Sequence, residues 1–441
     1  MISKSVTQLS VGGQGAAMSM HLIDDIEDLV KEDRVHRRVY TDPSLFEEEM
    51  RRIFYRVWSF VGHESEVPYP GDYKTTRLGR QQVIMSRHED GNIYVMYNRC
   101  MHRGPVVCRE ESGNSKYFRC MYHGWTYRND GSLSGVPFRS GYPPDFDFKG
   151  LGLMRLSRVG SYRGFVFASL SPEGESLAEF LAPVRSYIDK ILDRAPDGEI
   201  EVRCGVQKYE YFGNWKLQFE NFIDHYHAPF THESAFVSGV GEEIYRKRFL
   251  SQEVRDAVEV RAFKYGHSIL DHPHKGGNGK EPEAFRSALE KSRGKERAEA
   301  ILSGDLHVNV FPTLLFQEHS QSYRVIRPIG VDRTEVFVYP YRLKGAPEEF
   351  NDTMVRGVSY WAAATGTGQP DDLEAMTRAQ LGLQAEGPEW VIFARGIHHE
   401  KVGPLGERIS GKGTDETGIR GLHRYWKELM LRSDGRSEKR S

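Results

Sequence analysis

Four cysteine and histidine residues in the first third of the chain have the spacing of metal ligands. Cys100-Met-His102 is followed, after seventeen residues, by Cys120-Met-Tyr-His123, and a glycine comes soon after each pair. Thiolate and imidazole groups bind both zinc and iron. The pattern therefore fits either a tetrahedral Cys2His2 zinc site or a [2Fe-2S] cluster, in which two thiolates hold one iron and two imidazoles hold the other.

A second group of candidate ligands lies further along the chain, in the segment Asn214–His232. Apolar side chains recur there at helical steps of four, three and four: Trp215, Phe219, Phe222 and Tyr226. A continuous helix would put His227 and His232 on different sides, so we expect Pro229 to break it and to bring His232 back toward His227. On its own, His-x4-His also fits ordinary surface or core histidines. With a carboxylate, two imidazoles form the facial triad of non-haem Fe(II) oxygenases.

Together the two segments resemble the large (alpha) subunit of Rieske non-haem iron aromatic-ring hydroxylating oxygenases. The first segment carries Arg103-Gly104 after its first pair and Gly124-Trp125 after its second. The second segment reads Asn-Trp-Lys-x3-Glu-Asn-x2-Asp-x-Tyr-His-x4-His. The resemblance implies one Rieske [2Fe-2S] cluster and one mononuclear Fe(II) per chain. Its cluster ligands would be Cys100, His102, Cys120 and His123, and its iron ligands would include His227 and His232.

The same resemblance implies a third iron ligand and two further catalytic residues. Related enzymes use the second acid of an acidic pair, with a glutamine eight residues later, and Asp372 and Gln380 reproduce that spacing. Asp371 is the alternative ligand, or else the N-cap of a helix. Asp224 would link an iron histidine to a cluster histidine of the neighbouring subunit, unless it is simply a solvated helix acid. Asn221 is the other residue assigned to catalysis.

The activity implied by the resemblance is that of a terminal oxygenase, which uses O2 and electrons from NAD(P)H to hydroxylate an aromatic substrate. Two residues separate Asn221 from Asp224, as in relatives that act on benzoate, salicylate or terephthalate. We therefore expect cis-dihydroxylation of a substituted aromatic acid. Polycyclic or biphenyl-type hydrocarbons, and monooxygenation or demethylation, are the alternatives. Aromatic residues near the iron motif fit either a pocket lining or ordinary core: Phe219, Phe222, Phe230 and Val310–Phe316.

Partner proteins are required by this interpretation. The chain has no Gly-x-Gly-x-x-Gly dinucleotide motif, so reduction by NAD(P)H must take place on another polypeptide. The resemblance implies a reductase, with or without a ferredoxin. It also implies a trimer of alpha subunits with a small beta subunit (alpha3beta3), in which electrons pass from the cluster of one subunit to the iron of its neighbour.

Composition and length narrow the remaining possibilities. The formal net charge is -2, with acids and bases interspersed, so nothing favours nucleic acid or an anionic membrane as a partner. We expect a cytoplasmic protein, because the sequence has neither a long apolar run nor an apolar leader segment. Four cysteines are too few for a disulfide scaffold. Cys108 and Cys204 are expected to be buried apolar thiols.

The elements that must position these sites indicate an α+β protein. We expect a helical arm at 1–55, a small antiparallel β Rieske domain at 56–165, and at 166–441 a larger catalytic domain with a central antiparallel sheet flanked by helices. Residues 43–58 have helical periodicity. Short β-type runs are predicted at 82–85, 92–97, 164–168, 322–326 and 334–341. The charged, Gly-rich segment 271–299 is expected to be an exposed loop or lid.

Overall fold

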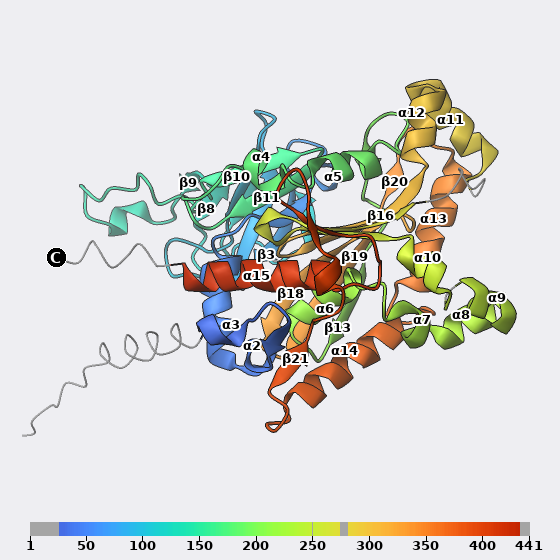
Figure 1. Ribbon diagram of the computed structural model, residues 1–441. Helices are drawn as coiled ribbons and strands as arrows, with labels where there is room; N and C mark the ends of the chain where they lie inside the picture. Colours follow the sequence, from blue (N-terminus) through green and yellow to red (C-terminus); the bar gives the residue numbers. More distant parts are fainter. Residues whose placement is uncertain (1–25, 249, 274–280, 433–441) are drawn as a thin grey trace, which may run out of the picture.

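The computed structural model describes residues 26–248, 250–273 and 281–432. The first part of the predicted N-terminal arm, residues 1–25, lies outside the described residues. Figure 1 shows a smaller body made of strands beside a larger body in which helices surround a sheet. The predicted α+β class, with a small β domain and a larger mixed domain, is confirmed. The boundaries at 55 and 165 stay predictions.

The small domain consists of short antiparallel strands. Within the described residues they form a four-stranded sheet in the order β5 (Ile93–Tyr97), β4 (Gln81–Arg87), β3 (Asp72–Leu78), β6 (Ser112–Asn114). Two three-stranded sheets flank it: β10 (Arg158–Tyr162), β11 (Phe165–Ser169), β2 (Ser59–His63), and β7 (Tyr117–Arg119), β8 (Thr126–Arg128), β9 (Leu133–Gly135). Alternate residues of β4 enter two separate small cores, because successive side chains of a strand point to opposite faces.

The larger domain is built on an antiparallel sheet that has nine strands in the described part of the chain. Their spatial order is β13 (Gln207–Tyr211), β19 (Arg333–Pro340), β18 (Ser322–Gly330), β17 (Leu314–Gln317), β16 (Gly304–Val310), β15 (Ser268–Pro273), β14 (Glu259–Ala262), β23 (Arg408–Ser410), β22 (Lys401–Val402). The strands predicted at 322–326 and 334–341 lie in β18 and β19, and those at 82–85, 92–97 and 164–168 lie in β4, β5 and β11.

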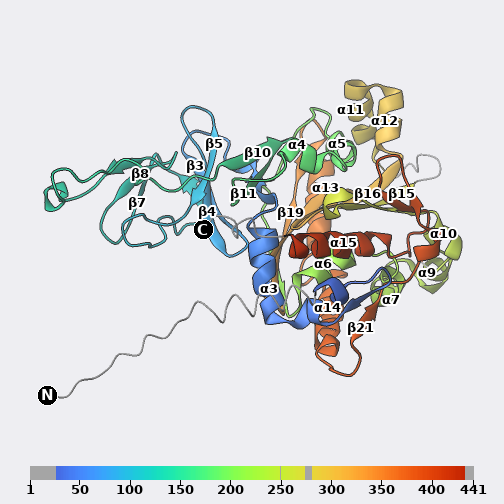
Figure 2. The same cartoon turned by 60° about the vertical axis from the view of Figure 1, so that its left-hand side comes forward.

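Two helices that matter for the site pack on this sheet, α6 (Trp215–Phe222) and α15 (Thr417–Leu431). Figures 1 and 2 show α15 running across the sheet with α6 beside it. The other helices from residue 177 onward are α4 (Leu177–Leu181), α5 (Arg185–Leu192), α7 (Ala228–Thr231), α8 (Glu233–Val240), α9 (Glu242–Arg248), α10 (Gln252–Asp256), α11 (Glu283–Arg293), α12 (Lys295–Ile301), α13 (Glu348–Trp361) and α14 (Gln369–Leu383).

The helix predicted at 43–58 is present but shorter. It begins as α3 (Pro43–Glu49), continues as a π-helical turn at Met50–Phe54, and ends there. Asp42 caps it, and Pro43 occupies its first turn, where the missing N–H costs nothing. Its apolar side chains belong to the same hydrophobic core as α6 and α15. The N-terminal segment from residue 26 therefore packs as part of the larger body.

The exposed loop predicted at 271–299 is wrong for most of that segment. Strand β15 extends to Pro273, and α11 and α12 occupy Glu283–Arg293 and Lys295–Ile301. Phe285 and Leu289 are fully buried at helical spacing, which gives α11 an apolar side that the surrounding charges obscure. The Gly-rich centre of the segment, residues 274–280, lies outside the described residues.

Candidate metal centres and active site

The four predicted cluster ligands stand on two loops with the same backbone design. In the first loop the Cys100 N–H donates to the Pro105 carbonyl (2.8 Å) and the Gly104 N–H to the Cys100 carbonyl (3.0 Å). In the second, the Cys120 N–H donates to the Trp125 carbonyl (2.8 Å) and the Gly124 N–H to the Cys120 carbonyl (3.0 Å). Each glycine has a positive φ, +84° and +71°, which permits the tight turn. The two loops are therefore equivalent cradles that face each other.

The side chains on these loops fit a [2Fe-2S] cluster. The sulfurs of Cys100 and Cys120 are buried, and the rings of His102 and His123 lie 4.6 Å apart between centroids. The Tyr127 hydroxyl lies 3.2 Å from the Cys100 sulfur, as expected for a donor that stabilises a thiolate. Among the described residues, three ligand atoms come within 4.8 Å of one another only at the iron site described below. The four groups thus do not converge on one ion, as zinc would require.

The two other cysteines are not predicted ligands of the cluster. Cys108 is buried, and burial raises the pKa of its thiol to about 12, so it is an inert core thiol as predicted. Cys204 is only partly buried, contrary to the expectation, because it lies at the surface between β12 (Ile200–Glu201) and β13. All four cysteines are free thiols in the described chain.

The predicted iron histidines follow α6, but not by the route expected from the sequence. The helix ends at Phe222, before any proline, and residues 224–227 form an irregular turn. Pro229 lies in the first turn of α7, where proline starts a helix instead of breaking one. His227 is the N-cap residue of α7 and His232 follows its last residue. The two imidazoles are therefore brought together by the short helix α7, which separates the end of α6 from the start of α8.

His227, His232 and Asp372 form the one group in the described residues with the geometry of a metal-binding triad. The Asp372 carboxylate oxygen Oδ1 lies 3.4 Å from Nε2 of His227 and 3.3 Å from Nε2 of His232. Asp372 comes from the first turn of α14, which packs beside α6 and α7. All three ligand atoms point to one place, and His232 and Asp372 are buried. A donor set of two imidazoles and one carboxylate suits Fe(II).

An acidic side chain lies beside the outer nitrogen of each histidine. Oδ2 of Asp371 forms a hydrogen bond with Nδ1 of His232 (3.3 Å), whereas Oδ2 of Asp224 lies 3.2 Å from Nδ1 of His227 without the geometry of a hydrogen bond. A carboxylate beside the outer nitrogen favours a proton there and leaves Nε2 to a metal. Asp371 is neither the triad carboxylate nor an N-cap, since Gly368 caps α14. Sequence reasoning missed its contact with His232, although its position beside Asp372 was a usable signal.

Asn221 contacts two members of the triad. Its side-chain nitrogen donates to Asp372 Oδ1 (3.0 Å) and lies 3.2 Å from Nε2 of His227. Electrostatics also favour a cation here. Burial lowers the pKa of His227, but its contacts with Asp224 and Asp372 outweigh burial and raise that pKa to about 10. Burial opposes ionisation of Asp372, yet the two histidines hold its pKa well below the usual range. A metal cation would take the place of the protons.

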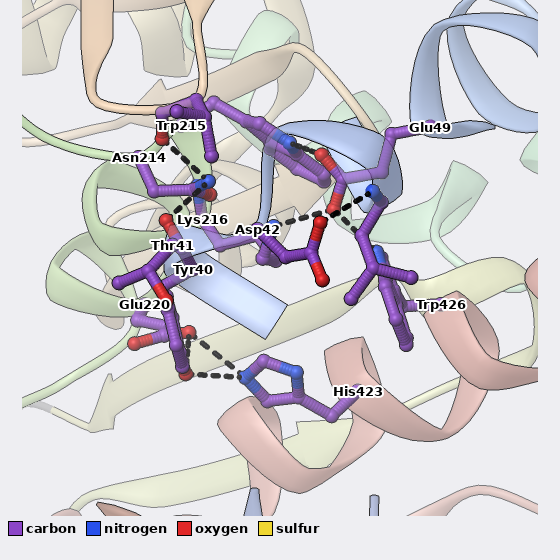
Figure 3. Close-up of polar contacts among 12 residues, drawn as sticks. Tyr40, Thr41, Asp42, Glu49, Asn214, Trp215, Lys216, Glu220, His423 and Trp426 are labelled. Atoms are coloured by element: carbon purple, nitrogen blue, oxygen red, sulfur yellow. Dashed lines mark hydrogen bonds and ion pairs between the residues drawn. The ribbon is translucent and has the colours of Figure 1, made fainter. Parts of the chain in front are cut away.

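Behind the iron site, α6 is fixed by a buried ion pair that sequence reasoning did not find. Glu49 from α3 pairs with Lys216, and both side chains are almost completely buried (Figure 3). The same carboxylate accepts hydrogen bonds from the indole N–H groups of Trp215 (2.9 Å) and Trp426 (2.6 Å). These donors satisfy a carboxylate that would otherwise be costly to bury. The motif residues Trp215 and Lys216 thus hold α6 against α3 and α15.

Two further contacts complete this support. The Tyr40 hydroxyl donates to Glu220 (2.8 Å), and His423 of α15 lies 2.8 Å from the same Glu220 oxygen (Figure 3). The Asn214 backbone N–H donates to Gln380 Oε1 (2.9 Å), and the Gln380 amide donates to the Tyr40 carbonyl (3.2 Å). Gln380 therefore joins α14 to the start of α6. The glutamine eight residues after Asp372 fixes the position of that carboxylate relative to Asn221.

Comparisons with known proteins agree with this geometry. Residues 57–147 match the Rieske [2Fe-2S] domain family, and residues 202–432 match the ring hydroxylating alpha subunit (catalytic domain) family. The chain belongs to the ring-hydroxylating oxygenase alpha subunits. Membership confirms the resemblance read from the motifs. It makes the protein a ring-hydroxylating dioxygenase, an oxidoreductase that incorporates O2, with a Rieske cluster domain and a non-haem iron catalytic domain.

Relatives in this family span almost the whole chain. The toluate 1,2-dioxygenase alpha subunit of Pseudomonas putida is 34% identical, over 96% of this chain and 98% of that protein. The anthranilate 1,2-dioxygenase large subunit of Acinetobacter baylyi is 35% identical, over 92% and 91%. A solved structure of a naphthalene 1,2-dioxygenase mutant bound to phenanthrene is 29% identical with a TM-score of 0.83, covering 92% of this chain and 94% of that one. These matches support the function predicted from the motifs.

Two further expectations concern membrane-spanning helices and the aromatic residues near the iron motif. No helix in the described residues is long and apolar enough to cross a membrane. Of the aromatic residues predicted to be either pocket lining or ordinary core, Phe219 and Phe222 belong to the hydrophobic core, whereas Phe230 is 63% exposed. Phe230 is therefore a surface residue of α7 and not part of a buried lining.

Proposed function

We propose that this alpha subunit catalyses the cis-dihydroxylation of a substituted aromatic acid. The observation that carries the proposal is the triad of His227, His232 and Asp372 joined to Asn221, in a chain that also has a Rieske domain. The spacing of Asn221 and Asp224 and the similarity to the toluate and anthranilate dioxygenase subunits favour an acid over a hydrocarbon. Similarity to naphthalene 1,2-dioxygenase keeps polycyclic hydrocarbons as the second candidate.

The residues divide between two groups of ligands. Cys100, His102, Cys120 and His123 would hold one [2Fe-2S] cluster, and His227, His232 and Asp372 would hold one Fe(II). When bound, the cluster supplies electrons one at a time and the iron supplies an open coordination site for O2. The chain's own part is to orient the imidazoles through Asp224 and Asp371, and to place the Asn221 amide against the triad.

Electron transfer between subunits is supported by the arrangement of the two sites. Figures 1 and 2 place β8 of the cluster domain far from α7 and α14 of the iron site. Apolar residues are exposed at both places: Met121 and Tyr122 on the cluster loop, and Tyr226 and Phe230 by the iron histidines. Exposed apolar side chains of this kind mark contact surfaces. We propose a trimer in which each cluster loop meets a neighbour's α7, with a small beta subunit, a reductase and, where required, a ferredoxin.

Products formed by the holoenzyme test this proposal. Purified enzyme with NADH and a matched reductase should convert benzoate-type acids to cis-diols, and with 18O2 both oxygen atoms of the diol should carry the label. Faster conversion of naphthalene or biphenyl would shift the proposal to the second candidate. Products that contain one labelled oxygen, or that have lost a methyl group, would contradict dihydroxylation.

The coupling role of Asp224 has its own test. The carboxylate contacts His227 and remains partly exposed on the side of α7, so it can meet a neighbouring subunit. At saturating iron we expect Asp224→Asn to hold both metals and to lose nearly all turnover, because the amide keeps an acceptor oxygen but lacks the charge of the carboxylate. Metal analysis, the visible spectrum and product formation measure the three quantities. Substantial turnover by fully loaded Asp224→Asn would contradict the coupling role.

A further inference from the structure

A buried arginine on the central sheet has no partner for its charge. Arg324 of β18 is only 4% exposed, and its Nε atom has no hydrogen-bond partner. In residues 26–248, 250–273 and 281–432, no side chain or carbonyl makes a hydrogen bond or ion pair with this guanidinium. Its Cζ atom lies 5.0 Å from the centroid of the Phe222 ring. Burying an unpaired charge is costly, so arginines at such positions are normally paired. A group of opposite charge is missing from this place.

The unpaired guanidinium lies on the side of the sheet that faces the iron site. Asn309, Leu315 and Arg324 are in register across β16, β17 and β18, and so share one face. That face packs on α6, since the Asn309 amide donates to the Phe219 carbonyl (3.0 Å). Phe222, which Arg324 contacts, is the last residue of α6. The residue before Phe222 is Asn221, which donates a hydrogen bond to Asp372. Phe222 therefore lies between Arg324 and a residue that contacts the triad.

Two nearby histidines and an acid complete the surroundings of Arg324. The His307 ring lies 5.0 Å from the Phe222 ring, on the same sheet face. Asp305, also on β16, is held 3.0 Å from Nδ1 of His319, so its charge has a partner already. The His319 side chain is nevertheless 46% exposed, which shows open space at this edge of the face. Aromatic rings beside one unpaired cation, with a few polar groups, form a lining that suits a small aromatic anion.

The carboxylates of Asp372 and Asp305, which lie near this region, already have histidine partners. Asp372 contacts both triad histidines, and Asp305 contacts His319. Burial raises the pKa of the Tyr209 phenol, Arg324 lowers that pKa and Asp372 raises it, so both charges lie near this one side chain. Neither acid is within ion-pair distance of Arg324. The cation is thus free for a ligand and near enough to the triad to act on what binds there.

We propose that Arg324 binds the carboxylate of an aromatic acid and fixes which edge of its ring faces the triad. This inference rests on the proposed function and names the residue that recognises the carboxylate of the substrate. A guanidinium matches a carboxylate with two parallel N–H···O bonds, so it selects an acid over a neutral arene and also orients it. Holding the ring in one orientation limits the carbon atoms that can be oxidised.

Binding measurements on the loaded oxygenase test the assignment without depending on turnover. Benzoate is the anionic probe, and benzamide is its neutral analogue of nearly the same shape. Isothermal titration should show benzoate binding about 10- to 100-fold more weakly to Arg324→Gln than to the wild-type enzyme, the factor expected for bonds to a charged group. Benzamide affinity should change little. Arg324→Lys should recover part of the benzoate affinity, because it restores charge without the fork geometry.

Arg327 offers a matched control in the same strand. It is a partly buried arginine, but three residues further on it points to the opposite sheet face, where its guanidinium lies 3.9 Å over the Phe337 ring and donates to Thr76 (2.7 Å). Arg327→Gln should leave the ratio of benzoate to benzamide affinity unchanged. Arg324→Gln should also raise the melting temperature of the ligand-free enzyme, because it removes an unpaired buried charge.

The outcomes separate this inference from the proposed function. Equal benzoate affinity in the wild type and Arg324→Gln, or an equal loss for benzoate and benzamide, would overturn the role of Arg324. So would a wild-type enzyme that binds benzamide as tightly as benzoate. If benzoate binds through Arg324 but is not dihydroxylated, the assignment of Arg324 stands and the proposed reaction fails.

Discussion

The two metal-ligand sets of this protein are built in different ways. The cluster ligands lie close together in sequence, on two loops that repeat the same backbone hydrogen bonds. The iron ligands come from the turn after α6, the end of α7 and the first turn of α14, and the helix behind them depends on α3 and α15. The first site is held by its own loops, whereas the second is held by contacts between distant parts of the chain.

This difference predicts how far the effect of a substitution should extend from each metal site. A change in one cluster loop alters a local structure, so the iron site should survive it. A change in the buried contacts behind α6 moves the helix that positions Asn221 and leads to His227, and it also loosens the core shared by α3 and α15. The iron site should therefore be sensitive to substitutions that touch no ligand. The predictions below test this contrast.

The strongest separation is expected from Cys100→Ser. Loss of one thiolate should abolish the cluster and its visible absorbance, while the mononuclear iron remains, because the two sites share no residue and lie apart (Figure 2). Cys108→Ser is the matched control, since Cys108 is also buried in the small domain but is not a predicted ligand. Absorbance and iron content per chain measure both effects. Loss of the mononuclear iron together with the cluster would show that the sites are not independent.

The next largest effect is expected at the ion pair behind α6. Lys216→Met would leave the Glu49 carboxylate buried without its cation, and breaking a buried pair in this way costs about 3–5 kcal/mol. We expect a lower unfolding midpoint and reduced iron content, with the cluster spectrum intact below that midpoint. Urea unfolding followed by tryptophan fluorescence, with metal analysis, provides the measurement.

Two controls sharpen that test. The double variant Glu49→Gln/Lys216→Met should recover much of the lost stability, because it removes both charges. Glu242→Gln breaks an exposed pair with Arg246 and should leave the midpoint unchanged. If Lys216→Met and Glu242→Gln had similar effects, the buried network would not support the iron site.

The same contrast explains which features the sequence was able to predict. The strands around the cluster loops follow from alternating apolar runs, and those predicted at 82–85 and 92–97 are present. The cluster ligands follow from a fixed Cys-His spacing, and their assignment stays a prediction. The end of α6 was not predicted correctly, because the helix ends at Phe222 with no proline or glycine to mark it, and Pro229 begins α7. Local periodicity carries no information about such ends, so the interpretation of Pro229 as a helix breaker was wrong.

Long-range partners were beyond local reasoning for a similar reason. The roles of Glu49 and His423 depend on helices that lie far from α6 in the sequence and beside it in space (Figure 3). Lys216 and Glu220 were visible only as parts of an iron motif, although the structure uses them to hold the helix. Arg324 had no signal at all, because an arginine within a strand shows its missing partner only when its surroundings are known.

A smaller effect is expected where a residue supports a ligand without being one. Asp371→Asn should weaken iron binding about 10- to 100-fold, the usual consequence of losing a carboxylate that orients a metal-binding histidine. Asp372→Asn should be more severe and leave almost no bound iron, because Asp372 is the triad carboxylate. Competition with an iron chelator measures both affinities. The reverse order would show that Asp371 is the ligand.

The smallest effect should distinguish the two cluster loops from each other. Alanine at a left-handed position costs about 1–2 kcal/mol, so Gly104→Ala and Gly124→Ala should both lower the temperature at which the cluster absorbance is lost. A Cβ at Gly124 would lie 3.0 Å from the Pro137 ring, whereas one at Gly104 would meet the flexible Arg99 side chain at 3.3 Å. Gly124→Ala should therefore be the more harmful.

Gly141→Ala is the control for this pair of loop variants, because a Cβ there meets nothing within 4 Å and its φ is not in the left-handed region. It should leave the bleaching temperature unchanged. Iron content at the mononuclear site should be the same in all three variants, since strain in a cluster loop has no path to α6 or α14. A loss of that iron in Gly124→Ala would mean that the loops act beyond their own site, and the contrast between a local and a distributed metal site would fail.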